Sequence, residues 1–255
     1  LVPFFGSTKI ASIRRSNVNA YIESRTGEVA AGTIIKEANT LKHLFALACE
    51  DWELIPANPA KRIKLPEAPE GRTRHLQPRE LQTLLLACPV WLRPIVALAV
   101  STGMRRGELM RIRWKDVDVK SGRILLSLTK NKKPRFAYLN QLSHQVVAYL
   151  EPETHKPSEK LFPGFTPAQV SVAVIRACEK AGITDFSIHD LRHTYASQLR
   201  MNGEDLHTIG QLLGHKDLRM TARYAHLHAE FLGAAAGKLD EVFTDRLTIG
   251  PGEPE

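Results

Sequence analysis

One stretch of the sequence, residues 187–226, constrains the chain more than any other, because it joins reactive side chains to two helical patterns. His189 and Arg192 lie three residues apart, so a helix places them on one face. The second helical pattern ends in a glycine turn before His215, and Tyr224 follows nine residues after this histidine. This module therefore supplies imidazoles, a guanidinium and a phenol, which are the groups needed to attack a phosphodiester without a metal.

The chemistry of phosphoryl transfer explains why these residue types matter. Negative charge develops on the non-bridging oxygens, and fixed positive donors lower the barrier where it develops. Arginine suits this task because its planar fork stays charged and can hold two oxygens at once. Free tyrosine titrates near ~10, so a tyrosine nucleophile needs a proton acceptor at neutral pH. Histidine, which exchanges protons around pH ~6 to 7, can serve as that acceptor.

A second motif, residues 101–109, follows a buried-helix pattern at residues 94–101. Gly103 can end that helix, and Arg105 can open the next one, where free backbone N–H groups favour an anion. Glu108 falls one turn later, so it is placed to orient Arg105 or a histidine. This motif predicts an arginine held at an anion site.

The only clear β pattern covers residues 116–139 and predicts a three-stranded antiparallel sheet. Lys130 lies in a turn-like segment between two of the strand patterns, residues 123–128 and 135–139. A lysine at the tip of a hairpin can reach into a groove and donate a proton to a leaving alkoxide. Further helices are expected at residues 78–88, 141–150 and 167–181.

Together these motifs resemble the tyrosine recombinase family, the phage-integrase and Xer-type site-specific recombinases. The matching residues are 102–109 (TGMRRGEL), Lys130 in a hairpin, 189–192 (HDLR), 213–215 (LGH) and 224–226 (YAH). They occur in the family's order and at its spacing across roughly residues 75–230. One departure, Ala137-Tyr138 in place of the common Val-Pro, concerns strand packing more than chemistry.

The resemblance implies six catalytic residues, Arg105, Lys130, His189, Arg192, His215 and Tyr224. The two arginines would hold the scissile phosphate, and the lysine would be the general acid toward the 5′-oxygen. The two histidines would activate or orient the reacting groups, with Glu108 in support, and the tyrosine would form a 3′-phosphotyrosyl bond. The implied activity is metal- and ATP-independent DNA recombination and integration, without a cofactor.

The same resemblance implies the partners. Double-stranded DNA would be the substrate, and four protomers on two duplexes would exchange strands through a four-way junction. The free protein would be a monomer or a weak oligomer. Residues 229–244 form a helical pattern that would dock onto a neighbouring protomer or pack onto their own domain.

Other interpretations of single residues stay open from the sequence. Tyr224 alone also suits a packing or surface position, and Lys130 alone suits a solvated loop. His189 and His193 have a metal-ligand spacing, but the residues between them lack the glutamate of a zincin, and an arginine beside a cation is unfavourable. We therefore expect no metal, and we assign His193 a structural or DNA-facing role.

Composition agrees with a polyanionic partner without requiring one. The 255 residues contain 35 basic and 27 acidic side chains, a formal net charge of +8. Three cysteines, Cys49, Cys88 and Cys178, lie far apart, which favours a reducing compartment over secretion. No signal peptide or membrane-length apolar run is present in the sequence. We expect a cytoplasmic protein of bacterial or phage origin.

The expected fold is mainly α with a small antiparallel β-sheet, divided into two domains. Residues 1–65 resemble the helical, SAM-like core-binding domain of the family, shortened at its N-terminus because the chain starts at leucine and opening helices are missing. Residues 66–75 form a linker, residues 76–248 the catalytic domain, and residues 249–255 a disordered tail. In the first domain Thr33 would cap a helix with the apolar positions Ile34, Ala38, Leu41, Phe45, Ala48 and Trp52.

Basic residues outside the motifs are candidates for contacts with DNA phosphates, each of which steepens the salt dependence of binding. These candidates are Lys36, Lys42, Lys61, Arg62, Lys64, Arg72, Arg74, Lys132 and Lys133. A solvated linker is the alternative for those near the domain boundary.

Three other functions fit parts of the pattern. A type IB topoisomerase uses similar chemistry but relaxes DNA without a defined site. A non-catalytic DNA-binding relative is disfavoured because every expected catalytic position is filled. A metal-dependent nuclease is disfavoured because clustered carboxylates are missing from the sequence.

Overall fold

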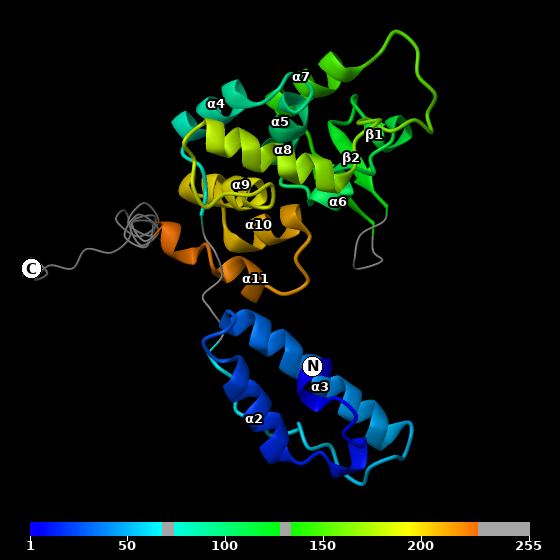
Figure 1. Ribbon diagram of the computed structural model, residues 1–255. Helices are drawn as coiled ribbons and strands as arrows, with labels where there is room; N and C mark the ends of the chain where they lie inside the picture. The colour runs from blue at the N-terminus through cyan, green and yellow to red at the C-terminus, as the bar shows by residue number, and fades with distance from the viewer. Residues whose placement is uncertain (68–73, 128–133, 229–255) are drawn as a thin grey trace, which may run out of the picture. The chain divides into compact units, whose positions relative to one another are not determined.

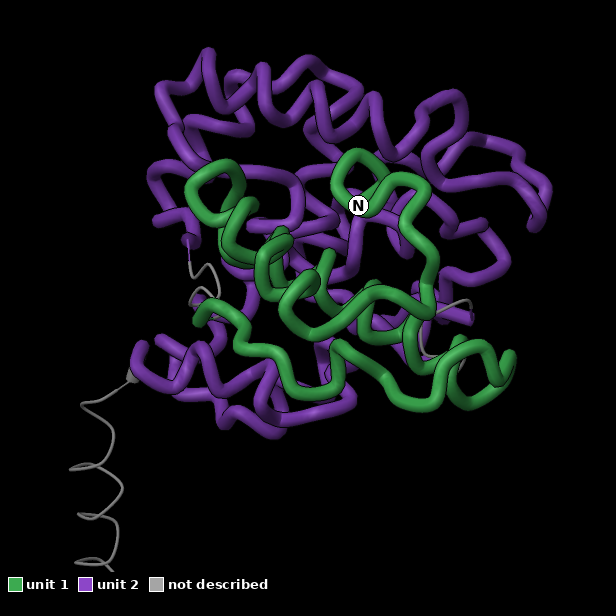
Figure 2. Tube along the Cα trace, turned by 60° about the horizontal axis from the view of Figure 1, so that its bottom comes forward, with its two compact units in different colours: residues 1–71 green, residues 72–255 purple. Residues whose placement is uncertain are grey.

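The computed structural model describes residues 1–67, 74–127 and 134–228. It divides into two compact units, Leu1–Gly71 and Arg72–Glu255 (Figure 2). The domain boundaries expected from the sequence stay a prediction. Residues 229–244, expected to be helical, and the expected disordered tail lie outside the described residues.

The first unit is built from helices. They are α1 (Val2–Phe5), the short 3₁₀ helix η1 (Ile10–Ser12), α2 (Arg15–Arg25) and α3 (Ala31–Glu50) (Figure 1). The side chains of α3 that recur every three or four residues are buried, as the sequence predicts, and they pack against α2. The expected cap and end of α3 are wrong. Its N-cap is Ala30, and Trp52 lies beyond the helix with 51% of its surface exposed.

The second unit holds eight α-helices and a small sheet among the described residues. Its helices are α4 (Pro78–Ala87), α5 (Arg93–Thr102), α6 (Arg106–Leu109), α7 (Gln141–Leu150), α8 (Pro167–Lys180), α9 (Asp190–Met201), α10 (Leu206–Leu213) and α11 (Arg219–Ala222). Its short 3₁₀ helices are η2 (Trp114–Asp116) and η3 (Ala225–His228), and its strands are β1 (Val117–Asp118), β2 (Arg123–Leu126) and β3 (Arg135–Tyr138).

The three strands form an antiparallel sheet in the order β1-β2-β3. In this sheet Leu126 of β2 pairs with Arg135 of β3. The helices expected from residues 78, 94, 141 and 167 onward are all present, within one or two residues of their expected bounds. The expected fold class, mainly α with a small antiparallel sheet, is confirmed.

Helix α5 lies at the centre of the second unit. All of its residues from Pro94 to Thr102 are buried, and it packs against α7 and α9. Helix α10 packs against α9, and α11 packs against α10 (Figure 1). Because α9 is packed against α5 on one side and α10 on the other, its side chains reach the ends of both.

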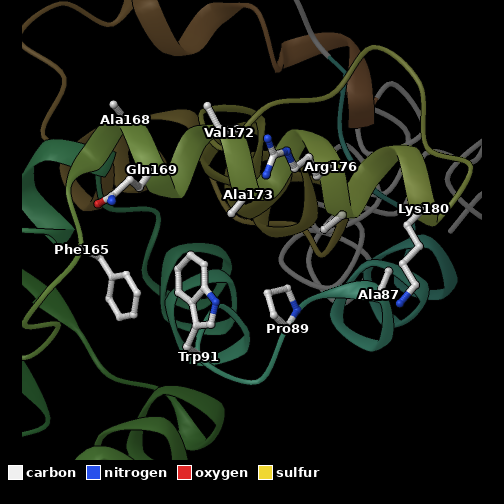
Figure 3. Close-up of a pocket in the computed structure, with 11 residues that line it drawn as sticks. Ala87, Pro89, Trp91, Phe165, Ala168, Gln169, Val172, Ala173, Arg176 and Lys180 are labelled. Atoms are coloured by element: carbon white, nitrogen blue, oxygen red, sulfur yellow. The ribbon is translucent and has the colours of Figure 1, made fainter.

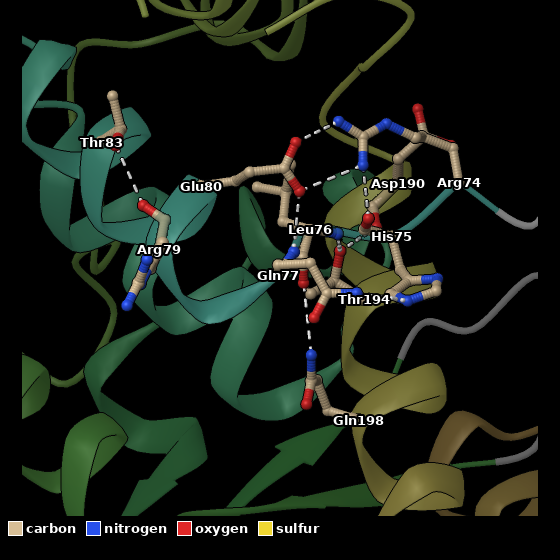
Figure 4. A network of polar contacts seen from close by, with 10 residues as sticks. All are labelled: Arg74, His75, Leu76, Gln77, Arg79, Glu80, Thr83, Asp190, Thr194 and Gln198. Carbon is tan, nitrogen blue, oxygen red and sulfur yellow. Dashed lines mark hydrogen bonds and ion pairs between the residues drawn. The ribbon is translucent and has the colours of Figure 1, made fainter. Parts of the chain in front are cut away.

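A polar network fixes α9 to the chain segment before α4 (Figure 4). The backbone N–H of Leu76 donates to Oγ1 of Thr194 over 3.0 Å, and the amide of Gln198 donates to the carbonyl of Leu76 over 3.2 Å. Nearby, Arg74 forms an ion pair with Glu80, with 2.6 Å between Nη2 and Oε1. The two bonds to Leu76 fix α9 at Thr194 and Gln198.

A separate apolar cluster joins α9, α10 and the segment after α11. Its buried members are Ala196, Ile209, Leu213 and Tyr224. Tyr224 lies between α11 and η3, and only 1% of its surface is exposed. The cluster therefore fixes this tyrosine beside α9.

Across the described residues, no helix combines the length and the apolar character that a membrane-spanning segment needs.

Candidate active site

The turn between α5 and α6 positions Arg105. Gly103 ends α5 in the left-handed region, at φ 61°, and a side chain there would collide with the ring of Tyr195. Arg105 is the N-cap of α6, and its backbone N–H donates to Oε2 of Glu108 over 2.9 Å. Its guanidinium donates to Oε1 of the same carboxylate over 3.0 Å. The carboxylate thus fixes both the backbone and the charge of Arg105.

The carboxylate of Glu108 also accepts a hydrogen bond from a second guanidinium, that of Arg135 on β3. Nη2 of Arg135 donates to Oε2 of Glu108 over 2.8 Å, and Nη1 donates to the carbonyl of Leu212 over 2.8 Å. Burial raises the pKa of Glu108, but the charges of Arg135 and Arg105 and the backbone hydrogen bond outweigh it, so the net shift is downward. The carboxylate stays ionised and links α6, β3 and the end of α10.

Arg192 is the most buried arginine of the site. Only 4% of its surface is exposed, and its guanidinium donates to the carbonyls of Gly103 over 2.7 Å and Leu213 over 2.5 Å. Burial, followed by the charge of Arg105, lowers its pKa to about 9. No carboxylate in the described part of the chain forms an ion pair with it. A buried cation without a counterion favours a bound anion.

His215 follows the end of α10. Gly214 adopts φ 65° there, and a side chain on it would meet the side chain of Arg135. Nδ1 of His215 is hydrogen-bonded to the hydroxyl of Thr221 over 2.8 Å, so a substrate would meet Nε2. Burial, followed by the charges of Arg192 and Arg105, lowers its pKa to about 4. The ring is therefore neutral at neutral pH.

Tyr224 makes its hydrogen bond to His193, which was expected to be structural or DNA-facing. Its hydroxyl lies 2.5 Å from Nδ1 of His193, and the two ring centroids are 5.9 Å apart. Burial raises the pKa of Tyr224 to about 12. Burial, followed by the proximity of His189, lowers the pKa of His193 to about 4. The proton of this pair therefore belongs to the tyrosine in the free protein.

His189 is the N-cap of α9 and contacts the other histidine of that helix. Its ring lies edge-on to the ring of His193, with 5.3 Å between centroids and 90° between planes. Burial, followed by the charge of Arg192, lowers its pKa. Five of the six expected catalytic residues, all except Lys130, thus come together through α9 and the segments that it contacts.

The remaining expected residues are placed as follows. Lys130, Lys132, Lys133 and Arg72 lie outside the described residues. Lys36, Lys42, Lys61, Arg62 and Lys64 are exposed in the first unit, as a phosphate contact requires. Arg74 instead points to Glu80, with which it forms two hydrogen bonds.

Sequence reasoning missed two residues of this site. His193 was expected to be structural or DNA-facing, but it contacts the hydroxyl of Tyr224. Arg135 was read only as part of a strand, although it is a partner of Glu108. The shared helix face of His189 and His193 is the one sequence signal that could have pointed to the first.

An apolar cavity of about 690 Å³ lies beside α8, away from these residues (Figure 3). Trp91, Phe165 and Val172 are in its lining, which includes no residue of the candidate site. In residues 1–67, 74–127 and 134–228, no three His, Cys, Asp or Glu side chains are grouped so that they could hold a metal ion.

The strongly lowered pKa values of two histidines predict how the free energy of unfolding depends on pH. His193 and His215 bind protons near ~6.5 in an unfolded chain but only near about 4 in the folded protein. Between these values the unfolded state holds more protons, so the free energy of unfolding should fall as pH is lowered from about 6.5 to about 4. Chemical denaturation at several pH values measures this slope.

A matched variant isolates the contribution of these two side chains. The double substitution His193→Gln and His215→Gln should flatten the slope across that window relative to the wild type. Parallel slopes for the two proteins would show that neither histidine is held neutral by the fold.

Comparison with known proteins identifies the family of this chain. The model of the phage integrase family matches residues 74–230. The integrase of Salmonella phage P22 is 28% identical over 229 residues, which cover 84% of this chain and 59% of that integrase. The tyrosine recombinase XerC of Lactobacillus leichmannii is 30% identical over 87% of this chain and 81% of its own length. The chain thus spans less than two thirds of the P22 integrase.

A solved structure shows the same fold. A lambda integrase dimer bound to a core site superposes with a TM-score of 0.70 at 21% identity, covering 83% of this chain and 82% of that one. The family match covers more than half of the chain, including every described residue of the candidate site. The chain belongs to the phage integrase, or tyrosine recombinase, family.

Proposed function

We propose that this protein is a site-specific DNA recombinase that cleaves and rejoins strands through a 3′-phosphotyrosyl bond. The observation that carries the proposal is the buried guanidinium of Arg192, which lacks a carboxylate partner in the described residues and interacts with the charge of Arg105. The two neighbouring positive charges repel each other in the free protein, and a phosphate bound between them offsets that repulsion. The scissile phosphate of DNA is the proposed anion.

The other residues of the site supply the remaining parts of the reaction. Tyr224 attacks the phosphorus, and the 5′-oxygen leaves with a proton from Lys130. His215 donates from Nε2 to a non-bridging oxygen, since its Nδ1 is engaged by Thr221. Arg105 and Arg192 hold the oxygens on which charge develops. The phosphotyrosyl bond conserves the energy of the broken bond, so a 5′-hydroxyl from another strand can reverse the step.

The proposed partner is double-stranded DNA, as in the lambda integrase structure, where a dimer is bound to a core site. We extend this to four protomers on two duplexes, which is the smallest assembly that exchanges strands in pairs. The exposed lysines and arginine of the first unit, Lys36, Lys42, Lys61, Arg62 and Lys64, are the proposed phosphate contacts outside the site. The proposed compartment is the cytoplasm, where these DNA substrates lie.

Covalent capture tests the proposal. The protein is incubated in EDTA with a library of duplexes that carry a randomised segment, denatured in SDS, and the protein-linked strands are sequenced. We expect linked DNA of one enriched sequence, joined through its 3′ end to the peptide that contains Tyr224. Mass spectrometry of the digested adduct identifies the peptide.

The other functions give different outcomes. Linkage without sequence enrichment, together with relaxation of any supercoiled plasmid, would indicate a type IB topoisomerase. Cut DNA without linked protein, formed only when EDTA is left out, would indicate a nuclease. Binding without linkage would contradict the catalytic assignment.

A further inference from the structure

The hydroxyl of Tyr224 has one hydrogen-bond partner within the described residues, and it is none of the six expected catalytic residues. The partner is Nδ1 of His193, at 2.5 Å. The tyrosine ring is held in an apolar cluster with 1% of its surface exposed, so the direction of the hydroxyl is fixed. The nucleophile of the proposed reaction is therefore oriented by a histidine for which the sequence predicted only a structural or DNA-facing role.

We propose that His193 is a further catalytic residue, whose Nδ1 holds the hydroxyl of Tyr224 and takes its proton as the phenolic oxygen attacks phosphorus. This inference rests on the proposed function and assigns the proton acceptor for its first step. The charge-stabilising residues act on the phosphate, whereas His193 acts on the nucleophile.

The position of His193 suits this role because the same helix carries the phosphate site. Arg192 is the preceding residue, and its guanidinium is fixed by two backbone carbonyls. Thr194 is the following residue, and its hydroxyl accepts from the backbone N–H of Leu76 (Figure 4). His193 thus sits between two anchored residues of α9. A rigid helix sets the distance between the proton acceptor and the phosphate.

The other two histidines have different surroundings. Nδ1 of His215 is hydrogen-bonded to Thr221, and burial, followed by the charge of Arg192, lowers the pKa of His215. His189 contacts the edge of the His193 ring, and no hydrogen bond between His189 and the Tyr224 hydroxyl is present in the described structure. The geometry therefore favours His193 as the group that exchanges a proton with the nucleophile.

The proposed step balances in atoms and charge. The O–H bond of Tyr224 breaks, its oxygen forms the bond to phosphorus, and the bond from phosphorus to the 5′-oxygen breaks. The tyrosine proton moves to Nδ1 of His193, and the 5′-oxygen takes a proton from Lys130. In the reverse step a 5′-hydroxyl returns its proton to Lys130, and His193 returns the other proton to the departing Tyr224.

The surroundings of His193 keep the proton on the Tyr224 hydroxyl until a phosphate is bound. Burial disfavours a proton on its ring most strongly, His189, Arg223 and Arg192 disfavour it further, and Asp190 favours it. In the free protein the proton stays on Tyr224, as the pKa values of both groups indicate. A bound phosphate offsets the charge of the arginines, so the imidazolium becomes easier to form during attack.

Two variants of His193 separate its two proposed roles, which are to accept the hydrogen bond from the Tyr224 hydroxyl and to take the proton of that hydroxyl. In His193→Asn the amide oxygen stands in for Nδ1, so it can accept the hydrogen bond but cannot take the proton. His193→Ala removes both functions. On the duplex enriched by covalent capture, His193→Asn should cleave about 10²-fold more slowly than the wild type, since general base catalysis contributes about this much. His193→Ala should be slower still.

A substrate with sulfur in place of the scissile 5′-oxygen shows whether His193 exchanges a proton with the Tyr224 oxygen or with the leaving 5′-oxygen. Sulfur leaves without a proton, so this substrate should restore cleavage by Lys130→Ala, which lacks the proposed acid. It should not restore cleavage by His193→Asn, whose defect lies at the nucleophile. Restoration of both variants would assign His193 to the leaving group and overturn the inference.

A second measurement guards against a purely structural effect. DNA with a 3′ p-nitrophenyl phosphate can be joined directly to a 5′-hydroxyl in a Tyr224→Phe background, where no tyrosine proton is moved. There His193→Asn should leave the joining rate unchanged, because the phosphate site is intact. A drop in that rate matching the drop in cleavage would show that His193 only supports the phosphate site.

The outcomes separate this inference from the proposed function. A wild-type covalent complex supports the function, and the ratio of variant to wild-type rates then decides the role of His193. Cleavage by His193→Asn at the wild-type rate would overturn the role of His193 alone. Absence of any wild-type covalent complex would overturn both.

Discussion

Tyr224→Phe should abolish the covalent complex with DNA while leaving DNA affinity nearly unchanged. The substitution removes only the hydroxyl, and the ring still fills the cluster formed by Ala196, Ile209 and Leu213. The lost hydrogen bond leaves Nδ1 of His193 without its partner, which costs about 1 kcal/mol of the free energy of unfolding. Denaturing gels measure the covalent complex, and a binding titration under native conditions measures the affinity.

Tyr195→Phe is the matched control. This tyrosine lies on α9, at the edge of the same cluster, and its ring packs against Gly103. Because the ring stays in place, this variant should form the covalent complex as the wild type does. A covalent complex that persists in Tyr224→Phe would place the nucleophile at another residue and remove the basis of the proposed function.

The parts of the site that sequence reasoning predicted depend on local backbone rules. Gly103 was expected to end a helix, and it does so in the left-handed conformation. Arg105 was expected to open the next helix with Glu108 one turn later, and the carboxylate of Glu108 accepts from both the backbone N–H and the guanidinium of Arg105 at the N-terminus of α6. Such contacts span three residues, so the sequence pattern determines them almost alone.

The parts that were missed depend on packing between distant segments. His193 and Tyr224 are 31 residues apart, and they meet because α9 packs against α10 and the segment after α11. Arg135 and Glu108 are 27 residues apart, on β3 and on α6, and Arg135 also donates to the carbonyl of Leu212 on α10. The sequence spacing of neither pair predicts its contact, because apolar packing between the elements decides where these polar side chains lie. Spacing predicts contacts on one helix, but not between elements.

Arg192→Ala should have the second largest effect, with cleavage reduced by about 10²-fold or more, as for the loss of one charge-stabilising donor. The variant should also lose stability, because the carbonyls of Gly103 and Leu213 lose their donors. Each buried carbonyl left unpaired costs about 1–3 kcal/mol. Single-turnover cleavage measures the first effect, and denaturant unfolding measures the second.

Two further variants separate the charge of Arg192 from its support of the fold. Arg105→Ala removes the neighbouring charge, but Arg105 is one-quarter exposed and bonds only to Glu108 among the described residues. It should therefore lose cleavage about as strongly as Arg192→Ala, by about 10²-fold, with a smaller loss of stability. Arg106→Ala is the matched control, since Arg106 instead bonds to Ser171 and should cleave as the wild type does. The outcomes separate the two roles.

If Arg105→Ala cleaved normally while Arg192→Ala did not, the loss of cleavage in Arg192→Ala would come from the two carbonyls that lose their donors. The phosphate would then have to bind elsewhere. Equal loss of cleavage with unequal loss of stability would mean that both guanidinium groups hold the same phosphate.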